Sequence, residues 1–321
     1  MAAVARGYGY GRPMRIQARA GSPVDRRYRG RSALPSGRLR LPRAIAPGID
    51  PAPLDDLLYM GGRVVPQMEF QNLYLGSLRD WDPADIELID AAIARAMREK
   101  RLNHVMAQYF PGARLDCDPR ESLVLSDPRP ARLDEPAIQQ KLVALYDAGR
   151  LRRRDLATTL FNLILPPKSV LLLDGDSSLR GLGGYHGSLH IRRAGRRVTL
   201  YYSANVYSER LPGGRENGIA AFDRPWKNVV GTLYHELNEF RTDPDVNDAI
   251  QRGNDDYLGW MSRSGFECGD QPIFAANSLG DVFKQVYAGS PRRRTPVQLM
   301  FSNAVHGAEG PLPRPRAQGP T

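Results

Sequence analysis

Residues 223–244 read DRPWKNVVGTLYHELNEFRTDP and predict the helix around which the rest of the chain is organised. Asp223 is a suitable N-cap, Pro225 fits the first turn, and Pro244 cannot continue a helix. The apolar side chains recur every three or four residues and therefore share one face: Trp226, Val229, Val230, Leu233, Leu237 and Phe240. The opposite face is polar, which is the arrangement that an active-site helix requires.

The polar face carries Tyr234-His235-Glu236-Leu237-Asn238-Glu239, a metalloprotease-type H-E-x-x motif whose expected second histidine is a glutamate. In H-E-x-x-H, two histidines one turn apart bind zinc and the intervening glutamate is the general base. His235 and Glu239 keep this spacing and so lie on one helical face. Glu236 keeps the general-base position. The motif predicts a metal-dependent hydrolase site, or the remains of one.

A metal bound by His235 and Glu239 needs a third ligand from elsewhere. Asp243 lies eight residues beyond His235, and that helical rise of about 12 Å is too long for one ion. We therefore expect Asp243 to cap the helix or to orient a neighbour. The remaining candidates lie on a downstream loop or on a glycine-rich turn: Glu267, Asp270 and His186.

In the catalytic interpretation, three protein ligands leave one coordination position for water. Glu236 would take a proton from that water while the metal polarises the scissile carbonyl. His186 or Tyr185 would stabilise the developing oxyanion.

The glutamate that replaces the second histidine also allows a different metal. Zinc is the first expectation, but oxygen-rich ligation suits Mn²⁺ or Ca²⁺ better. The acidic residues could then form a structural cation site in a protein without catalytic activity: Glu236, Glu239, Asp243, Glu267 and Asp270.

The net charge of +10 is concentrated at the two ends of the chain. Residues 1–50 contain 11 arginines and two aspartates, and residues 291–321 contain five arginines and one glutamate. The remaining residues hold 29 basic and 32 acidic side chains. Salt-sensitive nucleic-acid binding would therefore depend on the ends. We disfavour it because no motif of a nucleic-acid-binding module accompanies the basic residues.

Composition divides the chain into three parts. Residues 1–56 form an Arg/Gly/Pro-rich arm and residues 291–321 a Pro/Arg-rich tail, both expected to be disordered. Residues 57–290 are expected to form a single zincin-like α+β domain, with a mixed sheet and a long motif-bearing helix. No apolar run is long enough to span a membrane, and no signal peptide is visible. The compartment is left open.

Local patterns predict several further elements. A helix begins at Asp82-Pro83, where the aspartate caps the first turn. Cys117 and Cys268 could pair or remain as buried thiols. The other expected elements are a strand within 64–75, a helix over 135–146, strands at 162–165 and 170–173, a hairpin of 189–191 with 198–207 that turns at Ala194-Gly195, and a loop over 208–221.

A linked set of short motifs resembles the EXORDIUM (phosphate-induced protein) family and its bacterial relatives. The resemblance covers roughly residues 60–285. The motifs that carry it are Gly61-Gly62-Arg63-Val64-Val65, Gly184-Tyr185-His186, His235-Glu236-Leu237-Asn238-Glu239, Thr242-Asp243-Pro244, Gly259-Trp260 and Gly265-Phe266-Glu267-Cys268-Gly269-Asp270.

This resemblance implies a secreted or wall-associated protein whose biochemical activity is not settled. The chain departs from the family at Leu182-Gly183, where members often carry a cysteine, and at Gly269-Asp270-Gln271-Pro272, where the family has a G-D-x-C ending. The first hypothesis is a zincin-like hydrolase, with a peptidase preferred. The second is a non-catalytic binding protein for a cell-wall polymer, with Trp260 and Tyr257 as candidates for stacking on sugar rings.

Overall fold

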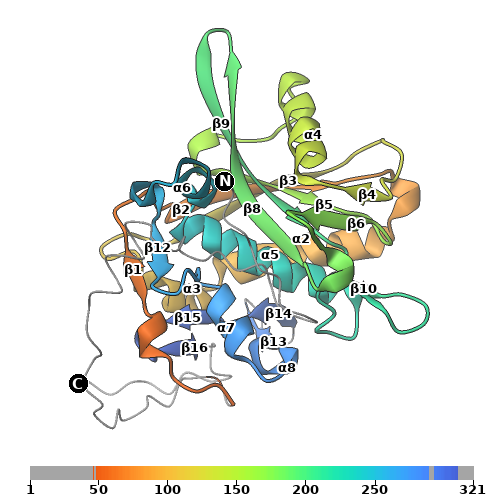
Figure 1. Cartoon of the computed structure of the whole chain (residues 1–321). Helices are drawn as coiled ribbons and strands as arrows, with labels where there is room; N and C mark the ends of the chain where they lie inside the picture. Colours follow the sequence, from red (N-terminus) through yellow and green to blue (C-terminus); the bar gives the residue numbers. More distant parts are fainter. Residues whose placement is uncertain (1–45, 47, 289–292, 310–321) are drawn as a thin grey trace.

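The computed structural model describes residues 46, 48–288 and 293–309, and it has the expected mixed α+β architecture. A five-stranded sheet has the order β3-β2-β5-β9-β8 (Figure 1). The first four are parallel to their neighbours, and β8 pairs antiparallel with β9 at one edge. The bounds are β2 (Gln67–Tyr74), β3 (Asp116–Val124), β5 (Thr159–Ile164), β8 (Gly184–Arg193) and β9 (Arg196–Asn205).

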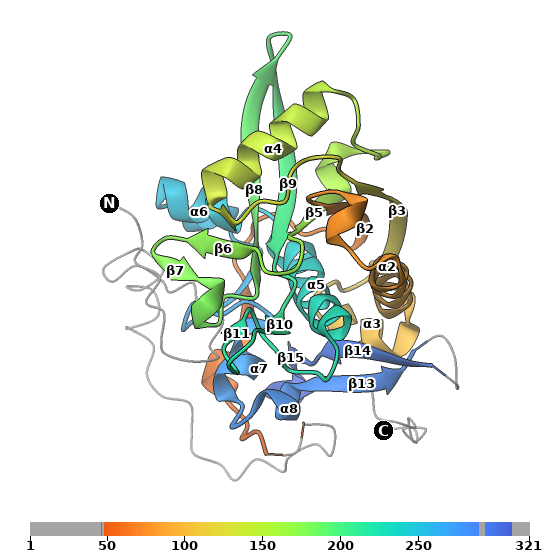
Figure 2. The same ribbon diagram turned by 90° about the vertical axis from the view of Figure 1, so that its right-hand side faces the viewer.

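Each face of this sheet contributes to a separate apolar layer, because successive strand residues point to opposite faces. In β5, Leu160 and Ile164 pack on one side, whereas Phe161 and Leu163 pack on the other. The first layer contains side chains of α2 (Pro83–Arg98), α3 (Lys100–Ala107) and α5 (Pro225–Thr242). The second contains side chains of α4 (Glu135–Asp147). Figure 2 shows α4 and α5 on opposite sides of the sheet. The motif helix α5 therefore lies against one face of the sheet.

Helix α5 is buried on all sides from Asn228 to Thr242. Its predicted apolar stripe packs into the first layer. Its polar face is also buried, because α5 also contacts β8 and the C-terminal strand β14 (Arg294–Gln298). Helix α5 is therefore a central helix of the fold and not a surface helix with one solvent-exposed face.

The predicted N-cap of α5 is wrong. The helix begins at Pro225, Arg224 occupies the cap position, and no side chain caps the first turn. Asp223 instead accepts a hydrogen bond from Lys227 Nζ at 2.7 Å. An aspartate and a lysine four residues apart form an ion pair readily, and this pair removes the carboxylate from the helix N–H groups.

Several local predictions are confirmed. Asp82 Oδ1 accepts from the backbone N–H of Ala84 at 2.9 Å, so this aspartate caps α2. Ala194 and Gly195 form the two-residue turn between β8 and β9, both with positive φ, as this tight hairpin requires. The predicted loop over 208–221 contains a small ladder of β10 (Glu209–Arg210) and β11 (Glu216–Asn217) that was not expected.

The ordered structure extends beyond the predicted limits of 57 and 290. At the start, the backbone N–H of Ala46 donates to the carbonyl of Ala308 at 2.8 Å. At the end, β14 pairs with β13 (Phe283–Tyr287), and β15 (Met300–Ser302) pairs with β16 (Gly307–Glu309). The side chains of Val297 and Phe301 are fully buried, so the hydrophobic effect holds this segment in the fold. The rest of the predicted arm and tail lies outside the described residues.

The remaining elements are short. Among the described residues, no helix has the length and apolar character needed to cross a membrane. Cys117 and Cys268 are buried free thiols. The other elements are β1 (Leu57–Tyr59), β4 (Arg132–Leu133), β6 (Val170–Leu173), β7 (Asp176–Ser177), β12 (Trp260–Ser262), α6 (Val246–Arg252), α7 (Asp270–Ala275), α8 (Leu279–Val282) and 3₁₀ turns at Pro53–Asp55, Leu78–Asp80, Leu156–Thr158, Ser178–Arg180 and Asp255–Tyr257.

A buried chain of polar side chains crosses the central sheet beneath the helices. Asn72 Nδ2 donates to Asp90 Oδ1 of α2 at 2.7 Å, and Asn162 Nδ2 donates to Asn72 Oδ1 at 2.8 Å. Ser203 Oγ then donates to Asn162 Oδ1 at 2.7 Å, and Asn205 Nδ2 to Ser203 Oγ at 2.8 Å. A slip of one residue would leave these groups unpaired, so the chain fixes the register of β2, β5 and β9.

The two aspartates near helix starts provide a matched test of capping. We expect Asp82→Ala to lower the free energy of unfolding by about 1 kcal/mol, because it removes a cap. Asp223→Ala should lower it by less than about 0.5 kcal/mol, because it removes only an exposed ion pair. Urea denaturation of both variants measures the difference, and equal effects would contradict the capping assignment.

Candidate metal centre

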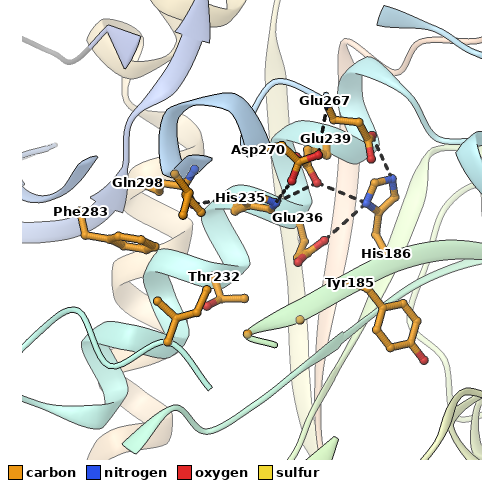
Figure 3. Close-up of a pocket in the computed structure, with 14 residues that line it drawn as sticks. Tyr185, His186, Thr232, His235, Glu236, Glu239, Glu267, Asp270, Phe283 and Gln298 are labelled. Carbon is orange, nitrogen blue, oxygen red and sulfur yellow. Dashed lines mark hydrogen bonds and ion pairs between the residues drawn. The ribbon is translucent and has the colours of Figure 1, made fainter. Parts of the chain in front are cut away.

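Six ionisable side chains meet beside the polar face of α5 (Figure 3). They come from three parts of the chain that the fold brings together: strand β8, helix α5, and the segment that leads into α7. All six are between 3% and 7% exposed. They are His186, His235, Glu236, Glu239, Glu267 and Asp270, which are six of the seven residues predicted for the site.

The first part of the cluster surrounds His235. Its Nε2 atom lies 3.0 Å from Glu239 Oε2 and 3.8 Å from Asp270 Oδ1. The ligand atoms of these three residues lie within 4.8 Å of one another, so they could hold one metal ion. The i, i+4 spacing of His235 and Glu239 thus produces the expected pair, and Asp270 is in position as third ligand.

A glutamine fixes the tautomer of His235. Gln298 Nε2 donates to the carbonyl of Gly269 at 2.5 Å, which leaves Gln298 Oε1 to face His235 Nδ1 at 2.9 Å. An amide oxygen can only accept, so Nδ1 carries a proton. When the ring is neutral, Nε2 is the unprotonated nitrogen, and it faces Glu239 and Asp270. Metal-binding histidines are oriented in this way by a second hydrogen-bonded group.

The second part of the cluster surrounds His186. Its Nε2 atom lies 3.2 Å from the carbonyl oxygen of Asp243. Its Nδ1 atom lies 3.4 Å from Glu236 Oε2 and 3.7 Å from Glu239 Oε2. The ligand atoms of His186, Glu236 and Glu239 form a second group within 4.8 Å that could hold a metal ion.

Close backbone contacts position Glu239, which belongs to both groups of candidate ligands. The backbone N–H of Gly269 donates to Glu239 Oε1 at 3.1 Å. A Cβ atom at residue 269 would lie 2.4 Å from His235 Nδ1, so a side chain there would displace the imidazole. Glu267 Oε1 is buried without a hydrogen bond, 3.7 Å from His186 Nε2.

Crowded carboxylates dominate the electrostatics. Burial would lower the pKa of His235, but Glu239 and its neighbours raise it to about 10, and the pKa of His186 is also raised. Burial and the proximity of Glu239 raise the pKa of Asp270 to about 8 and that of Glu267 well above its ordinary value. The folded protein therefore retains protons here unless another cation replaces them.

Tyr185 does not take the predicted oxyanion-stabilising position. Neighbouring strand residues face opposite sides, so His186 points into the cluster and the Tyr185 ring into the second apolar layer (Figure 3). There its ring packs edge-on against Tyr202, with centroids 6.0 Å apart.

Three other predicted residues lie around the cluster and not in it. Asp243 caps α5 and accepts from the backbone N–H of Gly259 at 3.0 Å, so it orients a neighbour as expected. Trp260 packs against Tyr59 and Tyr109, and Tyr257 against Arg252. Neither Trp260 nor Tyr257 lines the cavity beside the cluster.

The cavity beside the six side chains has a volume of about 40 Å³. Because about 10–15 Å³ of such space holds one water, the cavity admits a few waters. Apolar and hydroxyl side chains complete the wall: Ile219, Thr232, Ile273 and Phe283.

Gln298 is the site residue that sequence reasoning missed. It lies in β14, within the segment that composition assigned to a tail. The apolar pattern around Val297 and Phe301 could have indicated a strand. No sequence signal connects Gln298 to His235, 63 residues away.

Comparisons with known proteins leave the family undetermined. No family model matches the chain, and searches of curated proteins and of solved structures find no match. The resemblance to the EXORDIUM family therefore stays a prediction.

Proton linkage gives the first test of the site. The pKa of Asp270 rises from 3.8 to about 8 on folding and that of His235 from 6.5 to about 10. The folded state therefore binds more protons than the unfolded state, and stability is lost as pH rises through these folded-state values. We expect the metal-free protein in EDTA to unfold at lower urea concentration near pH 9 than near pH 6. An equal or higher midpoint near pH 9 would contradict this.

Gln298 gives the second test. Gln298→Leu removes the acceptor that fixes His235, and we expect metal affinity to fall about 10- to 100-fold. Gln285→Leu, on the exposed face of β13, is the matched control and should leave affinity unchanged. Competition titrations with a chromophoric chelator measure both, and unchanged affinity in Gln298→Leu would contradict the tautomer assignment.

Proposed function

We propose that this chain is a metal-dependent hydrolase with a zincin-like site, and that its substrate is a peptide. The observation that carries the proposal is the orientation of His235. Its Nε2 atom faces Glu239 and Asp270 while Gln298 contacts the opposite nitrogen. A histidine with these neighbours, beside a general-base glutamate, has the chemistry of a catalytic metal site.

His235, Glu239 and Asp270 would hold the ion. Zinc is the first candidate because an imidazole nitrogen and carboxylate oxygens are both common zinc ligands. Mn²⁺ also accepts such a set, whereas Ca²⁺ prefers oxygen ligands alone. A divalent ion here would supply Lewis acidity toward a carbonyl and toward water.

Glu236 would act as the general base. It follows His235 directly, and its carboxylate lies between the imidazole of His186 and the backbone of Gly184. A Cβ atom at residue 184 would lie 3.1 Å from Glu236 Oε1, so this oxygen faces the glycine closely. His186 would donate a hydrogen bond to the oxyanion when protonated.

The mixed sheet and its edge strand support a peptide substrate. β8 forms the edge of the central sheet nearest the cluster, and within the described residues only β9 pairs with it. An extended peptide can add to a free strand edge through backbone hydrogen bonds. Residues Tyr185 to Ser188 of this strand are buried, so a peptide would add along this edge only if the segments that cover it move aside.

A second candidate is a non-catalytic, EXORDIUM-like binding protein with a structural cation site. The observation that favours it is the small size of the cavity, about 40 Å³, beside a cluster whose six side chains are buried. The hydrolase proposal therefore requires the wall at Ile219, Ile273 and Phe283 to open. The binding-protein proposal requires no movement. Nucleic-acid binding stays disfavoured, and the basic ends that would carry it lie largely outside the described residues.

Glu236→Gln separates the two proposals. We expect the metal-loaded full chain to cleave members of a peptide library, and Glu236→Gln to cut the rate by about 10²- to 10⁴-fold while metal at His235 is retained. Glu87→Gln, an exposed substitution on α2, is the control.

Mass spectrometry of the products and metal analysis of each variant are the measurements. If metal raises the melting temperature but no peptide is cleaved, the hydrolase proposal is contradicted and the binding-protein proposal is favoured.

A further inference from the structure

We propose that the cluster holds two divalent ions, the second bound by His186, Glu236 and Glu239. Glu239 is shared between them. The inference rests on the proposed metal site at His235 and extends it to a two-metal centre.

The shared ligand atom is Glu239 Oε2. It lies 3.0 Å from His235 Nε2 and 3.7 Å from His186 Nδ1, so one oxygen is between the two imidazoles. The other oxygen of this carboxylate accepts from the backbone N–H of Gly269. The carboxylate is therefore anchored on one side and presents its free oxygen to both histidines (Figure 3).

His186 has the orientation of a metal ligand for the same reason as His235. The backbone carbonyl of Asp243 can only accept, so the contact at 3.2 Å places the proton on His186 Nε2. Nδ1 of a neutral ring then directs its lone pair at Glu236 and Glu239, 3.4 and 3.7 Å away. Three acceptors that face one another repel unless a proton on Nδ1 or a metal ion lies between them.

Two divalent ions would balance the charge of the cluster without retained protons. Glu236, Glu239, Glu267 and Asp270 bring four carboxylates into a space that is almost closed to water. Among the described residues, their ion-pair partners are the two histidines, and no arginine or lysine pairs with them. One divalent ion would leave two of the four carboxylates to be neutralised by retained protons, whereas two ions neutralise all four without them.

Glu267 lies on the other side of the His186 ring from the proposed second ion, with Oε1 3.7 Å from Nε2. Its side chain is 3% exposed, and its Oε1 atom lacks a hydrogen bond. It points toward His186 (Figure 3). A buried carboxylate oxygen without a hydrogen-bond partner is costly, and positive charge held on the opposite side of the His186 ring would reduce that cost.

Glu236 could act both as a ligand of the second ion and as the general base of the proposed hydrolase. Its Oε2 atom faces His186 and would bind the second ion, whereas Oε1 faces Gly184 and stays available to take a proton. Two metal ions about 3.5–4 Å apart can hold the attacking and leaving oxygens of a hydrolysis together.

Metal stoichiometry of the full chain tests the second ion. The protein is stripped with chelator, loaded with Mn²⁺, exchanged into metal-free buffer and analysed by mass spectrometry. We expect about two ions per chain in the wild type and about one in both His186→Ala and Asp270→Asn, since each variant removes a ligand of one ion. His104→Ala, an exposed histidine of α3, is the matched control and should keep two.

The possible outcomes separate the two proposals. If the wild type binds one ion and His186→Ala also binds one, the second site is overturned and the first stays intact. No ion in the wild type would overturn both. Two ions in His186→Ala would place the second ion elsewhere and overturn this inference.

Electron paramagnetic resonance of the Mn²⁺-loaded wild type gives a readout that does not depend on any variant folding. Two Mn²⁺ ions that share a carboxylate oxygen are exchange-coupled, and we expect the spectrum of a coupled pair. A spectrum of isolated Mn²⁺ would overturn the shared site even if His186→Ala does not fold.

Discussion

The concentration of carboxylates beside α5 is the constraint on which the rest of the structure depends. A carboxylate removed from water must be hydrogen-bonded or balanced by positive charge, and the penalty for failing is several kcal/mol per group. The surrounding chain supplies specific partners. Gly269 offers a backbone N–H to Glu239, Asp243 offers a carbonyl to His186, and Gln298 orients His235. The loop before α7, the end of α5 and strand β14 are thus all held in place by the same cluster.

The central sheet supplies rigidity on the other side. The polar chain from Asp90 to Asn205 fixes three parallel strands, and Asn205 pairs in register with Gly184 at the start of β8. His186, two residues along this edge strand, therefore has a fixed position relative to α5. The sheet thereby holds one histidine while the helix holds the other, and both meet at Glu239.

Sequence predicted the features whose energetics are local. Asp82 caps α2 and Ala194-Gly195 turns the hairpin because each depends on a few adjacent residues. Asp223 failed as a cap because Lys227, equally local, competes for its carboxylate. Tyr185 and His186 could not both face the site, since strand neighbours alternate. Gln298 could not be predicted, because its role depends on packing between segments far apart in sequence.

The position of Gln298 near the end of the chain also sets an order in time. Synthesis proceeds from the N-terminus at about 5–20 residues per second, so α5 leaves the ribosome several seconds before β14 can reach it. Until then His235 has no acceptor for Nδ1, and the carboxylates of α5 lack the covering strand. Any metal loading in the mature geometry therefore follows translation of residue 298, and a nascent chain that stalls before it carries the complete motif without the group that orients His235.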